Sequence, residues 1–303
     1  MKIGLIDVDG HNFPNLALMK LSAWHKAQGD TVEWWWGFGE YDRAYMSKVF
    51  DATYSADQLE PLNTKEVIRG GTGYGLDNRL PDEAEQIYPD YSIYPELTKE
   101  TAYGFLTRGC PRACGFCIVA GKEGRASIKV ADLSEWWRGQ KCIKLLDPNL
   151  LACPEHMDLL GQLADSGAWV DFTQGLDIRL TNARNVELIQ HIKTQTVHFA
   201  WDNPAQDLTE YFQRFKELSG IKDYRKLGVY VLTNYGDGET VEEKVENALR
   251  RINPLREMGY NPYVMIYDKP NAPQEIRLLQ RWCNNRIIFR SEPDFCKYDP
   301  KRG

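Results

Sequence analysis

Residues 108–117 read Arg108-Gly109-Cys110-Pro111-Arg112-Ala113-Cys114-Gly115-Phe116-Cys117. The three cysteines follow the spacing C-x3-C-x2-C, and no fourth cysteine occurs within the next twenty residues. Ferredoxin-type [4Fe–4S] clusters take four closely spaced cysteine thiolates. Three thiolates would leave one iron without a protein ligand, so that this iron could bind and activate a small molecule. The spacing therefore predicts a [4Fe–4S] cluster with one open iron.

Two other kinds of site also use closely spaced cysteines. Structural zinc sites usually combine two C-x2-C pairs, or one pair with paired histidines, and neither pattern follows here. A thioredoxin-like redox pair would use Cys114 and Cys117 at the start of a helix and would leave Cys110 without a role. The aromatic residue Phe116 and the flanking glycines agree with the spacing in favouring the open cluster.

The motif resembles that of the radical SAM superfamily, C-x3-C-x-aromatic-C in the loop after the first strand of a barrel. This resemblance implies that Cys110, Cys114 and Cys117 hold a [4Fe–4S] cluster, with S-adenosylmethionine on the fourth iron. It also implies reductive cleavage of S-adenosylmethionine to a 5′-deoxyadenosyl radical, which abstracts hydrogen from a substrate. Phe116 would lie against the adenine. A reductase such as flavodoxin or ferredoxin would be the expected partner.

Strand and helix patterns alternate from the cysteine motif onward. Strands are expected over residues 103–107, 141–146, 169–172, 196–199, 228–232 and 263–266. Helices are expected over 130–138, 154–166, 183–191 and 208–218, after the capping-box residues Thr240 and Glu243, and over 273–282. Six such units indicate an α/β protein with a parallel sheet and right-handed crossovers. The family resemblance, which covers about residues 101–289, implies that they form an open, partial (β/α)6 barrel.

Polar side chains follow three of these expected strands, at the strand ends where such sheets bind ligands. They are Asp147 and Asn149 after the second strand, Gln174, Asp177 and Arg179 after the third, and Asp202 after the fourth. A carboxylate here could bind ribose hydroxyls, and Arg179 could bind the methionine carboxylate, since guanidinium matches carboxylate geometry. Asp147 and Asn149 stand where many family members carry Gly-Gly-Glu for the methionine amino group. The residues after the third strand could equally form a solvated loop, in which an Asp177–Arg179 pair only shapes the turn.

Four further cysteines lie outside the motif: Cys142, Cys153, Cys283 and Cys296. None has a near neighbour in sequence, so a second cluster is not favoured. Buried cysteines without metal are common, and Cys142 falls in an apolar strand. Cys153 is the one that follows a predicted strand-end site.

The N-terminal residues show a second, smaller α/β pattern. Strands are expected over 2–8, 31–36, 48–53 and 66–71, with a helix over 15–28 that ends at Gly29. The run Asp9-Gly10-His11-Asn12-Phe13-Pro14 partly resembles the D-x-H-x-x-G motif of cobalamin-binding domains, whose histidine ligates cobalt. Gly70-Gly71 resembles the glycine pair beside the nucleotide tail of the corrin. Because Pro14 replaces the last glycine of the motif and the domain is short, bound cobalamin is not favoured.

These patterns divide the 303 residues into four parts. We expect a truncated, Rossmann-like and cobalamin-domain-like module over 1–76, a linker over 77–100, a radical SAM core over 101–290 and a tail over 291–303. The net charge of −6 argues against a broad nucleic-acid-binding face. Seven cysteines, an odd number, argue against a secreted disulfide scaffold. No signal peptide or membrane-length apolar run is visible, so we expect a cytoplasmic enzyme.

The substrate and the overall reaction stay open. The five histidines and the scattered acidic residues offer no recognisable acid/base pair, so no catalytic side chain is assigned. Two other classes of protein remain: an iron–sulfur sensor or electron carrier, and a zinc-stabilised binding module. A carrier prefers four protein ligands, and the missing fourth ligand and the acidic charge count against the zinc module.

Overall fold

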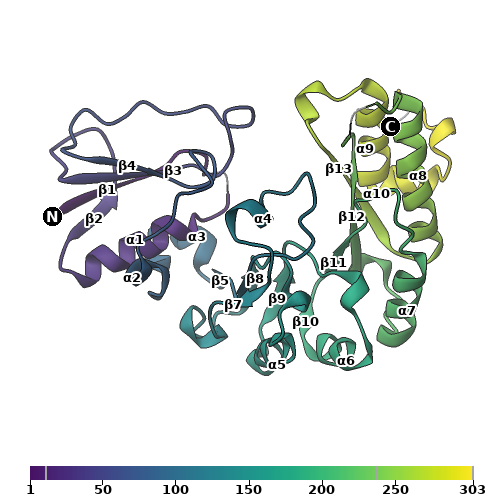
Figure 1. Ribbon diagram of the computed structural model, residues 1–303, viewed down its shortest axis with the longest axis horizontal. Coiled ribbons are helices and arrows are strands. Elements are labelled where there is room, and N and C mark those ends of the chain that lie inside the picture. Colours follow the sequence, from purple (N-terminus) through teal and green to yellow (C-terminus); the bar gives the residue numbers. More distant parts are fainter. Residues whose placement is uncertain (11, 237, 302–303) are drawn as a thin grey trace. The chain divides into compact units, whose positions relative to one another are not determined.

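A computed structural model describes residues 1–10, 12–236 and 238–301. The chain divides into two compact units, Met1–Leu146 and Asp147–Gly303 (Figure 1). Within the described ranges, none of the helices combines the length and the apolar character that crossing a membrane requires.

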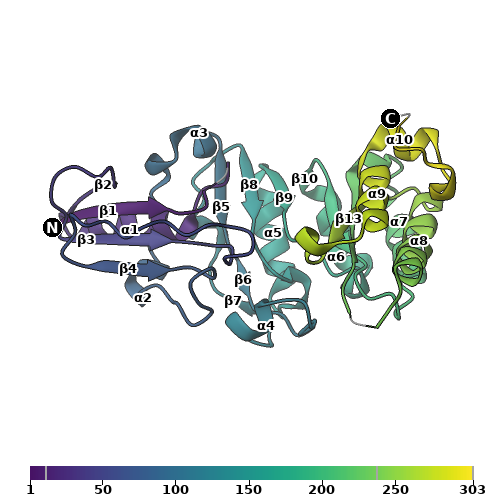
Figure 2. The same cartoon turned by 90° about the horizontal axis from the view of Figure 1, so that it is seen from above.

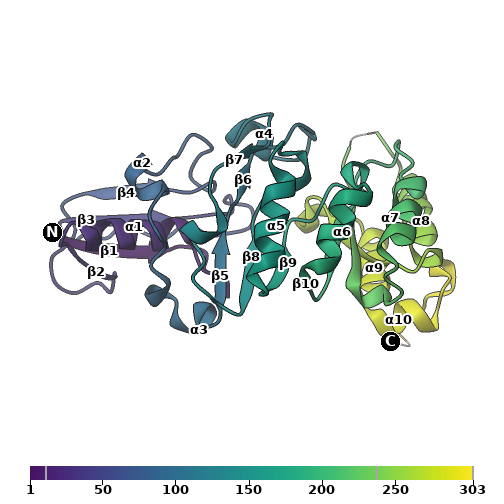
Figure 3. The same ribbon diagram turned by 90° about the horizontal axis from the view of Figure 1, so that it is seen from below.

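The first unit begins with a parallel sheet of four strands in the order β2-β1-β3-β4. The strands are β1 (Lys2–Asp7), β2 (Thr31–Trp34), β3 (Arg43–Ser47) and β4 (Val67–Gly70). Helix α1 (Leu16–Ala27) joins β1 to β2, and the Asn15 side chain caps it by accepting the Leu18 amide. Leu18 and Leu21 of this helix pack with Ile3 and Leu5 of β1 in one core cluster, so α1 covers one face of the sheet (Figure 3).

The strand predicted over 48–53 was wrong, because β3 ends at Ser47. Val49 and Phe50 are the apolar residues on which the predicted strand rested, yet both side chains are about half exposed. Their amides donate to the carboxylate of Asp9, at 2.9 Å from Val49 and 2.7 Å from Phe50. The chain therefore turns after β3 and leaves the sheet at the residues that looked most like a strand.

The rest of the first unit consists of short elements. They are α2 (Asp82–Glu85), η1 (Tyr91–Ile93), α3 (Pro95–Thr98), β5 (Thr101–Gly104), β6 (Thr107–Arg108), α4 (Val119–Lys122), β7 (Ile128–Lys129), η2 (Leu133–Glu135) and β8 (Cys142–Leu145). Strands β5 and β8 pair in parallel, and β6 and β7 pair antiparallel. The strand predicted over 103–107 is thus two strands, with a break after Gly104.

The helix predicted over 130–138 was also wrong, because only the short 3₁₀ turn η2 forms there. Asp132 and Glu135 make a capping box that could begin a longer helix. The ring of Trp136, however, packs onto Gly104, where an added Cβ would lie 2.3 Å from it. Gly139 then turns the chain with a left-handed φ of 90°. Burial of Trp136 therefore decides the local conformation.

The second unit alternates strands and helices. Its elements are η3 (Leu150–Ala152), α5 (His156–Ser166), β9 (Trp169–Phe172), η4 (Ile178–Leu180), α6 (Ala183–His191), β10 (Lys193–Thr194), β11 (Val197–Ala200), α7 (Thr209–Ser219), η5 (Tyr224–Lys226), β12 (Leu227–Thr233), α8 (Val241–Glu257), β13 (Asn261–Ile266), η6 (Lys269–Asn271), α9 (Gln274–Asn284), α10 (Arg286–Ser291) and η7 (Phe295–Lys297). Strand β9 pairs in parallel with β10, and β11, β12 and β13 form a second parallel sheet. The predicted alternation of strands and helices is confirmed here.

Helices cover one face of the sheet β11–β12–β13. Phe199 of β11 packs edge-on against Phe212 and Phe215 of α7. Figures 1 and 2 show α8 and α9 on one side of β13. Helix α8 begins with the predicted capping box, in which the Thr240 hydroxyl accepts the Glu243 amide at 3.2 Å.

Candidate functional site

The three motif cysteines lie in one loop of the first unit, between β6 and β7. Two residue pairs of these strands close the base of the loop. The Cys110 amide donates to the Gly124 carbonyl at 3.1 Å, and the Cys117 amide donates to the Cys114 carbonyl at 2.9 Å. The backbone thus ties the first cysteine to the far side of the loop and joins the other two in a tight turn.

Gly109 is the residue that lets this loop close. Its φ is 82°, a left-handed value that favours glycine. An added Cβ would lie 2.1 Å from the Ala126 carbonyl oxygen, so no larger residue fits without moving the backbone. The Gly109 amide also donates to Glu123 Oε2 at 3.1 Å, while Glu123 Oε1 accepts from Arg108 at 2.9 Å. The base of the loop is therefore held by backbone and side-chain contacts together.

The side chains of the loop are open to a ligand. Cys110 and Cys114 are half-buried and Cys117 is exposed; none of the three is in a disulfide. Phe116, the residue predicted to lie against adenine, is half-buried. Three thiols on one accessible loop are a donor set of the kind that [4Fe–4S] clusters use.

Within the described residues, no three His, Cys, Asp or Glu side chains are grouped closely enough to hold a metal ion. That finding concerns a single ion. In a four-iron cluster each thiolate binds a different iron, so the sulfur atoms stand further apart than the ligands of one ion do.

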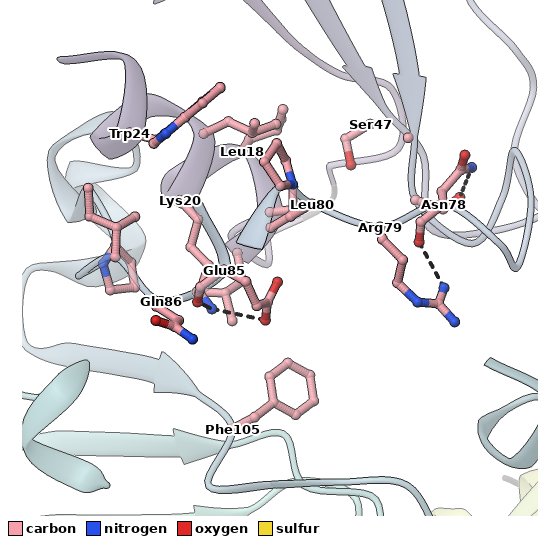
Figure 4. Close-up of a pocket in the computed structure, with 18 of the residues that line it drawn as sticks. Leu18, Lys20, Trp24, Ser47, Asn78, Arg79, Leu80, Glu85, Gln86 and Phe105 are labelled. Carbon is pink, nitrogen blue, oxygen red and sulfur yellow. Dashed lines mark hydrogen bonds and ion pairs between the residues drawn. The ribbon is translucent and has the colours of Figure 1, made fainter. Parts of the chain in front are cut away.

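A cavity of about 1060 Å³ lies within the first unit. Residues of α1, the ends of β3 and β4, and the base of the cysteine loop line it (Figure 4). Glu85 on its wall accepts from Lys20 Nζ at 3.1 Å and from Arg108 Nη2 at 3.2 Å. Burial lowers the pKa of Lys20, and the Glu85 charge opposes that effect. The cavity thus joins a charged wall to the base of the cysteine loop.

In the second unit, the structure brings three of the predicted strand-end residues together. Asn149 Nδ2 lies 3.5 Å from Asp177 Oδ2, and Arg179 Nε donates to Asp177 Oδ1 at 2.7 Å. Arg179 Nη1 donates to Gln206 Oε1 at 2.9 Å. Gln206 was missed from the sequence because it follows β11 within an irregular loop. Gln174 is exposed, and in the described part of the chain no hydrogen bond joins it to this group.

Asp202, the strand-end residue after β11, is half-buried and lies within electrostatic reach of two arginines. Its Oδ1 accepts the Leu232 amide at 3.2 Å. Burial raises the pKa of Asp202, while the charges of Arg251 and Arg179 oppose the rise. Arg251 is 3% exposed and donates to the Trp201 and Asp202 carbonyls at 2.8 and 2.9 Å. Burial lowers the pKa of this guanidinium to about 10.

Arg251 gave no signal in the sequence, because it falls within the helical pattern of α8. The buried residues of that helix include Ala248, Ile252 and Leu255, so Arg251 lies among the core positions. Its guanidinium reaches the carbonyls that follow β11 only because α8 packs across that strand end. The contact therefore depends on packing rather than on spacing.

Asp147 is buried at 4% exposure, and it lies within electrostatic reach of Cys153. Burial raises the pKa of the Cys153 thiol to about 11, and the thiol donates to Glu155 at 3.1 Å. Burial raises the pKa of Cys283 to about 12. Because the thiolate is the metal-binding form, these two cysteines are poorly suited as metal ligands. Cys142 is half-buried and Cys296 is exposed.

The N-terminal motif is only partly described, because His11 lies outside the described residues. Asp9 is buried, and its carboxylate is engaged by the amides after β3. Gly71 has a φ of 91°, and an added Cβ would lie 2.2 Å from the Lys48 carbonyl oxygen. These two motif residues therefore have structural roles within the chain itself. Gly70 differs, since an added Cβ there would meet open space and the residue lines the cavity.

Neither a protein-family model nor a curated protein sequence matches this chain. Among solved structures, one that is similar is the radical S-adenosylmethionine methyltransferase TsrM from Kitasatospora setae, with cobalamin and a [4Fe–4S] cluster bound. The TM-score is 0.61 at 11% sequence identity, and the match covers 88% of this chain and 74% of that chain. At this identity the likeness shows the fold alone. The chain has a mixed α/β fold with parallel sheets, similar to that of a radical SAM enzyme.

The finer expectations stay predictions. They are the closure of the strands into a (β/α)6 barrel, the four domain limits and the role of each site residue.

Proposed function

We propose that this chain is a radical SAM enzyme, which binds a [4Fe–4S] cluster through Cys110, Cys114 and Cys117 and cleaves S-adenosylmethionine. When bound, the cluster would supply one electron to the sulfonium, and the 5′-deoxyadenosyl group would leave as a radical. The observation that carries the proposal is the three-cysteine loop after β5 and β6, in a fold similar to that of a solved radical SAM enzyme.

In this function the protein holds the cluster without enclosing it. The contacts of Gly109, Arg108 and Glu123 hold the base of the loop without any metal. Three thiolates from one loop leave one iron for the cosubstrate, and half-buried Phe116 would supply a flat apolar surface for adenine.

The polar group of the second unit is proposed to bind the rest of S-adenosylmethionine. Arg179 donates from Nε to Asp177 and from Nη1 to Gln206. No described residue accepts a hydrogen bond from its Nη2. That remaining donor suits a carboxylate. Asp202 and Asp177 are the carboxylates proposed for the ribose, and Asp147 and Asn149 are proposed for the amino group. The alternative is that the Asp177–Arg179 pair only shapes its own turn. Asp177 also accepts the Arg179 amide at 3.2 Å and so caps η4.

Reduction of the cluster would require an external electron donor. We propose a soluble one-electron reductase such as flavodoxin or ferredoxin. Dithionite can replace it in an assay, so that the test of the chemistry does not depend on finding this partner.

The decisive test is anaerobic reconstitution of the full chain with iron and sulfide. We expect about four irons and four sulfides per chain. With dithionite and S-adenosylmethionine, we expect 5′-deoxyadenosine by chromatography and a change in the EPR signal of the reduced cluster. A cluster that neither cleaves nor responds to S-adenosylmethionine would identify a carrier or sensor instead. Bound zinc with no cluster would identify the zinc-stabilised module.

Cobalamin is not part of this proposal. Pro14 departs from the motif, and Asp9 and Gly71 are explained by contacts within the chain. We therefore expect hydroxocobalamin not to remain bound to the full chain, at micromolar protein, after gel filtration. Retention of one corrin per chain, and its loss when Gly70→Leu fills the adjoining cavity, would overturn this expectation.

A further inference from the structure

The cavity of about 1060 Å³ in the first unit has no role in the proposed function. Cavities that bind small molecules measure about 300 to 1,000 Å³ and combine apolar walls with a few polar groups. This one opens to solvent, since lining residues such as Arg79 and Gln86 are exposed. Its size and its opening therefore suit one small organic molecule.

One part of the cavity wall is apolar and only partly covered. Trp24 of α1, Ile68 of β4 and Leu80 pack against the core cluster of the first sheet, but each is only half-buried. All three line the cavity. Figure 4 shows the ring of Phe105 pointing into the cavity from the side opposite Leu80. A ligand with flat, apolar rings would cover these side chains, and burial of that surface would favour its binding.

Most of the positive charges around the cavity are already balanced by a carboxylate. Among the six lysines and arginines that line it, four form such an ion pair. These pairs are Lys20 and Arg108 with Glu85, Arg43 with Glu66, and Arg69 with Glu60.

Arg79 and Lys122 are the two exceptions in the part of the chain that the structure describes. Arg79 Nη1 donates to the carbonyls of Leu76 and Asn78 at 2.6 and 2.9 Å, and its Nη2 donates to the Lys122 carbonyl. Lys122 Nζ donates to the same two carbonyls, at 3.4 and 3.3 Å. Two like charges therefore share neutral acceptors on one wall of the cavity.

An anion would improve the surroundings of Lys122. Burial lowers the pKa of Lys122, and the charges of Arg79 and Arg108 lower it further. The carboxylates of Glu123 and Asp77 oppose this effect, but Glu123 already accepts from Arg108 at 2.9 Å. An acid group beside Arg79 and Lys122 would relieve their repulsion and accept charge-assisted hydrogen bonds.

We propose that this cavity binds an aromatic acid, with its rings against Leu80 and Phe105 and its acid group beside Arg79 and Lys122. The acid group is a carboxylate, phosphate or sulfonate, because all three present the oxygen acceptors that these cations lack. This inference goes beyond the proposed function and needs neither the cluster nor S-adenosylmethionine. It can therefore fail while the proposed function holds, and the reverse is equally true.

The test uses 8-anilinonaphthalene-1-sulfonate, an aromatic acid whose fluorescence rises when it leaves water. Titration of the full chain should show one saturable site. The double variant Arg79→Gln, Lys122→Gln should weaken binding at least about tenfold, because two charge-assisted contacts are lost. Arg79→Lys keeps the positive charge, so it should bind the probe more tightly than Arg79→Gln does. The matched control is Arg69→Gln, which should bind like the wild type, because Arg69 lines the same cavity but pairs with Glu60.

A second probe separates the acid group from the rings. N-phenyl-1-naphthylamine has the same rings without the sulfonate, so its affinity should not respond to the charge variants. Gly70→Trp should weaken both probes, because an added Cβ at Gly70 meets nothing within 4 Å and the residue lines the cavity. If Gly70→Trp does not fold, the charge variants still decide, since Arg79 is exposed and Lys122 is half-buried.

Three results would overturn the proposal. The first is the absence of a saturable site. The second is an affinity for the sulfonate that survives the double variant, or that falls equally in Arg69→Gln. The third is displacement of the probe by S-adenosylmethionine or by hydroxocobalamin, because the cavity would then be the site of that cofactor.

Discussion

The triple variant Cys110→Ala, Cys114→Ala, Cys117→Ala is expected to lose its iron and its formation of 5′-deoxyadenosine together. All three proposed thiolate ligands lie in one loop, so their removal leaves no protein ligand for the cluster. We expect iron, sulfide and visible absorbance to fall to background, and cleavage to fall at least about 100-fold. Metal analysis and chromatography on anaerobically reconstituted protein would measure both.

The matched control for this variant removes cysteines from elsewhere in the chain. Cys142→Ala, Cys296→Ala replaces one half-buried and one exposed cysteine, and neither belongs to the motif. This double variant should keep the wild-type iron content and the wild-type rate. A triple variant that still binds a cluster and cleaves S-adenosylmethionine would show that the ligands were assigned to the wrong residues. Equal loss in the control would assign the cluster to the other cysteines.

Gly109→Ala is expected to have the next largest effect, although it removes no ligand. The left-handed φ of 82° disfavours any side chain by about 1 kcal/mol, and the added Cβ would meet the Ala126 carbonyl at 2.1 Å. The backbone must therefore shift next to Cys110, and the pairing of its amide with Gly124 would be disturbed. We expect the iron content and the rate of S-adenosylmethionine cleavage to fall at least about tenfold.

The same loop provides a control that separates strain from collision. Gly124 has a left-handed φ of 98°, but an added Cβ there would meet nothing within 4 Å. Gly124→Ala therefore introduces the backbone strain without the clash. We expect it to keep most of the bound iron, within about a factor of three. If both variants behaved alike, the closeness of Gly109 to Ala126 would not be what shapes the loop.

Local patterns predicted most of the second unit well. Strand β9 and helix α6 have the bounds that the sequence indicated, and the capping box of Thr240 and Glu243 begins α8 as expected. These elements are decided by contacts between residues a few positions apart, such as caps and apolar periodicity. A short window of sequence contains that information.

The errors have the opposite cause. Val49 and Phe50 looked like a strand, but Asp9, which is far away in the sequence, binds their amides and turns the chain. Residues 130–138 looked like a helix, but the Trp136 ring packs on Gly104 instead. In both places a contact between distant residues overrode a local preference, which no short window could reveal.

The same contrast between local patterns and long-range contacts applies to the candidate site. The spacing of Cys110, Cys114 and Cys117 is readable in the chain because all three ligands come from one loop. Arg251 of α8 donates to the carbonyls of Trp201 and Asp202 after β11, so this contact has no signature in spacing. It forms only when α8 packs across the end of β11, which lies about fifty residues earlier in the chain. The donor set for the cluster was therefore visible before folding, whereas the contact of the buried arginine exists only in the folded unit.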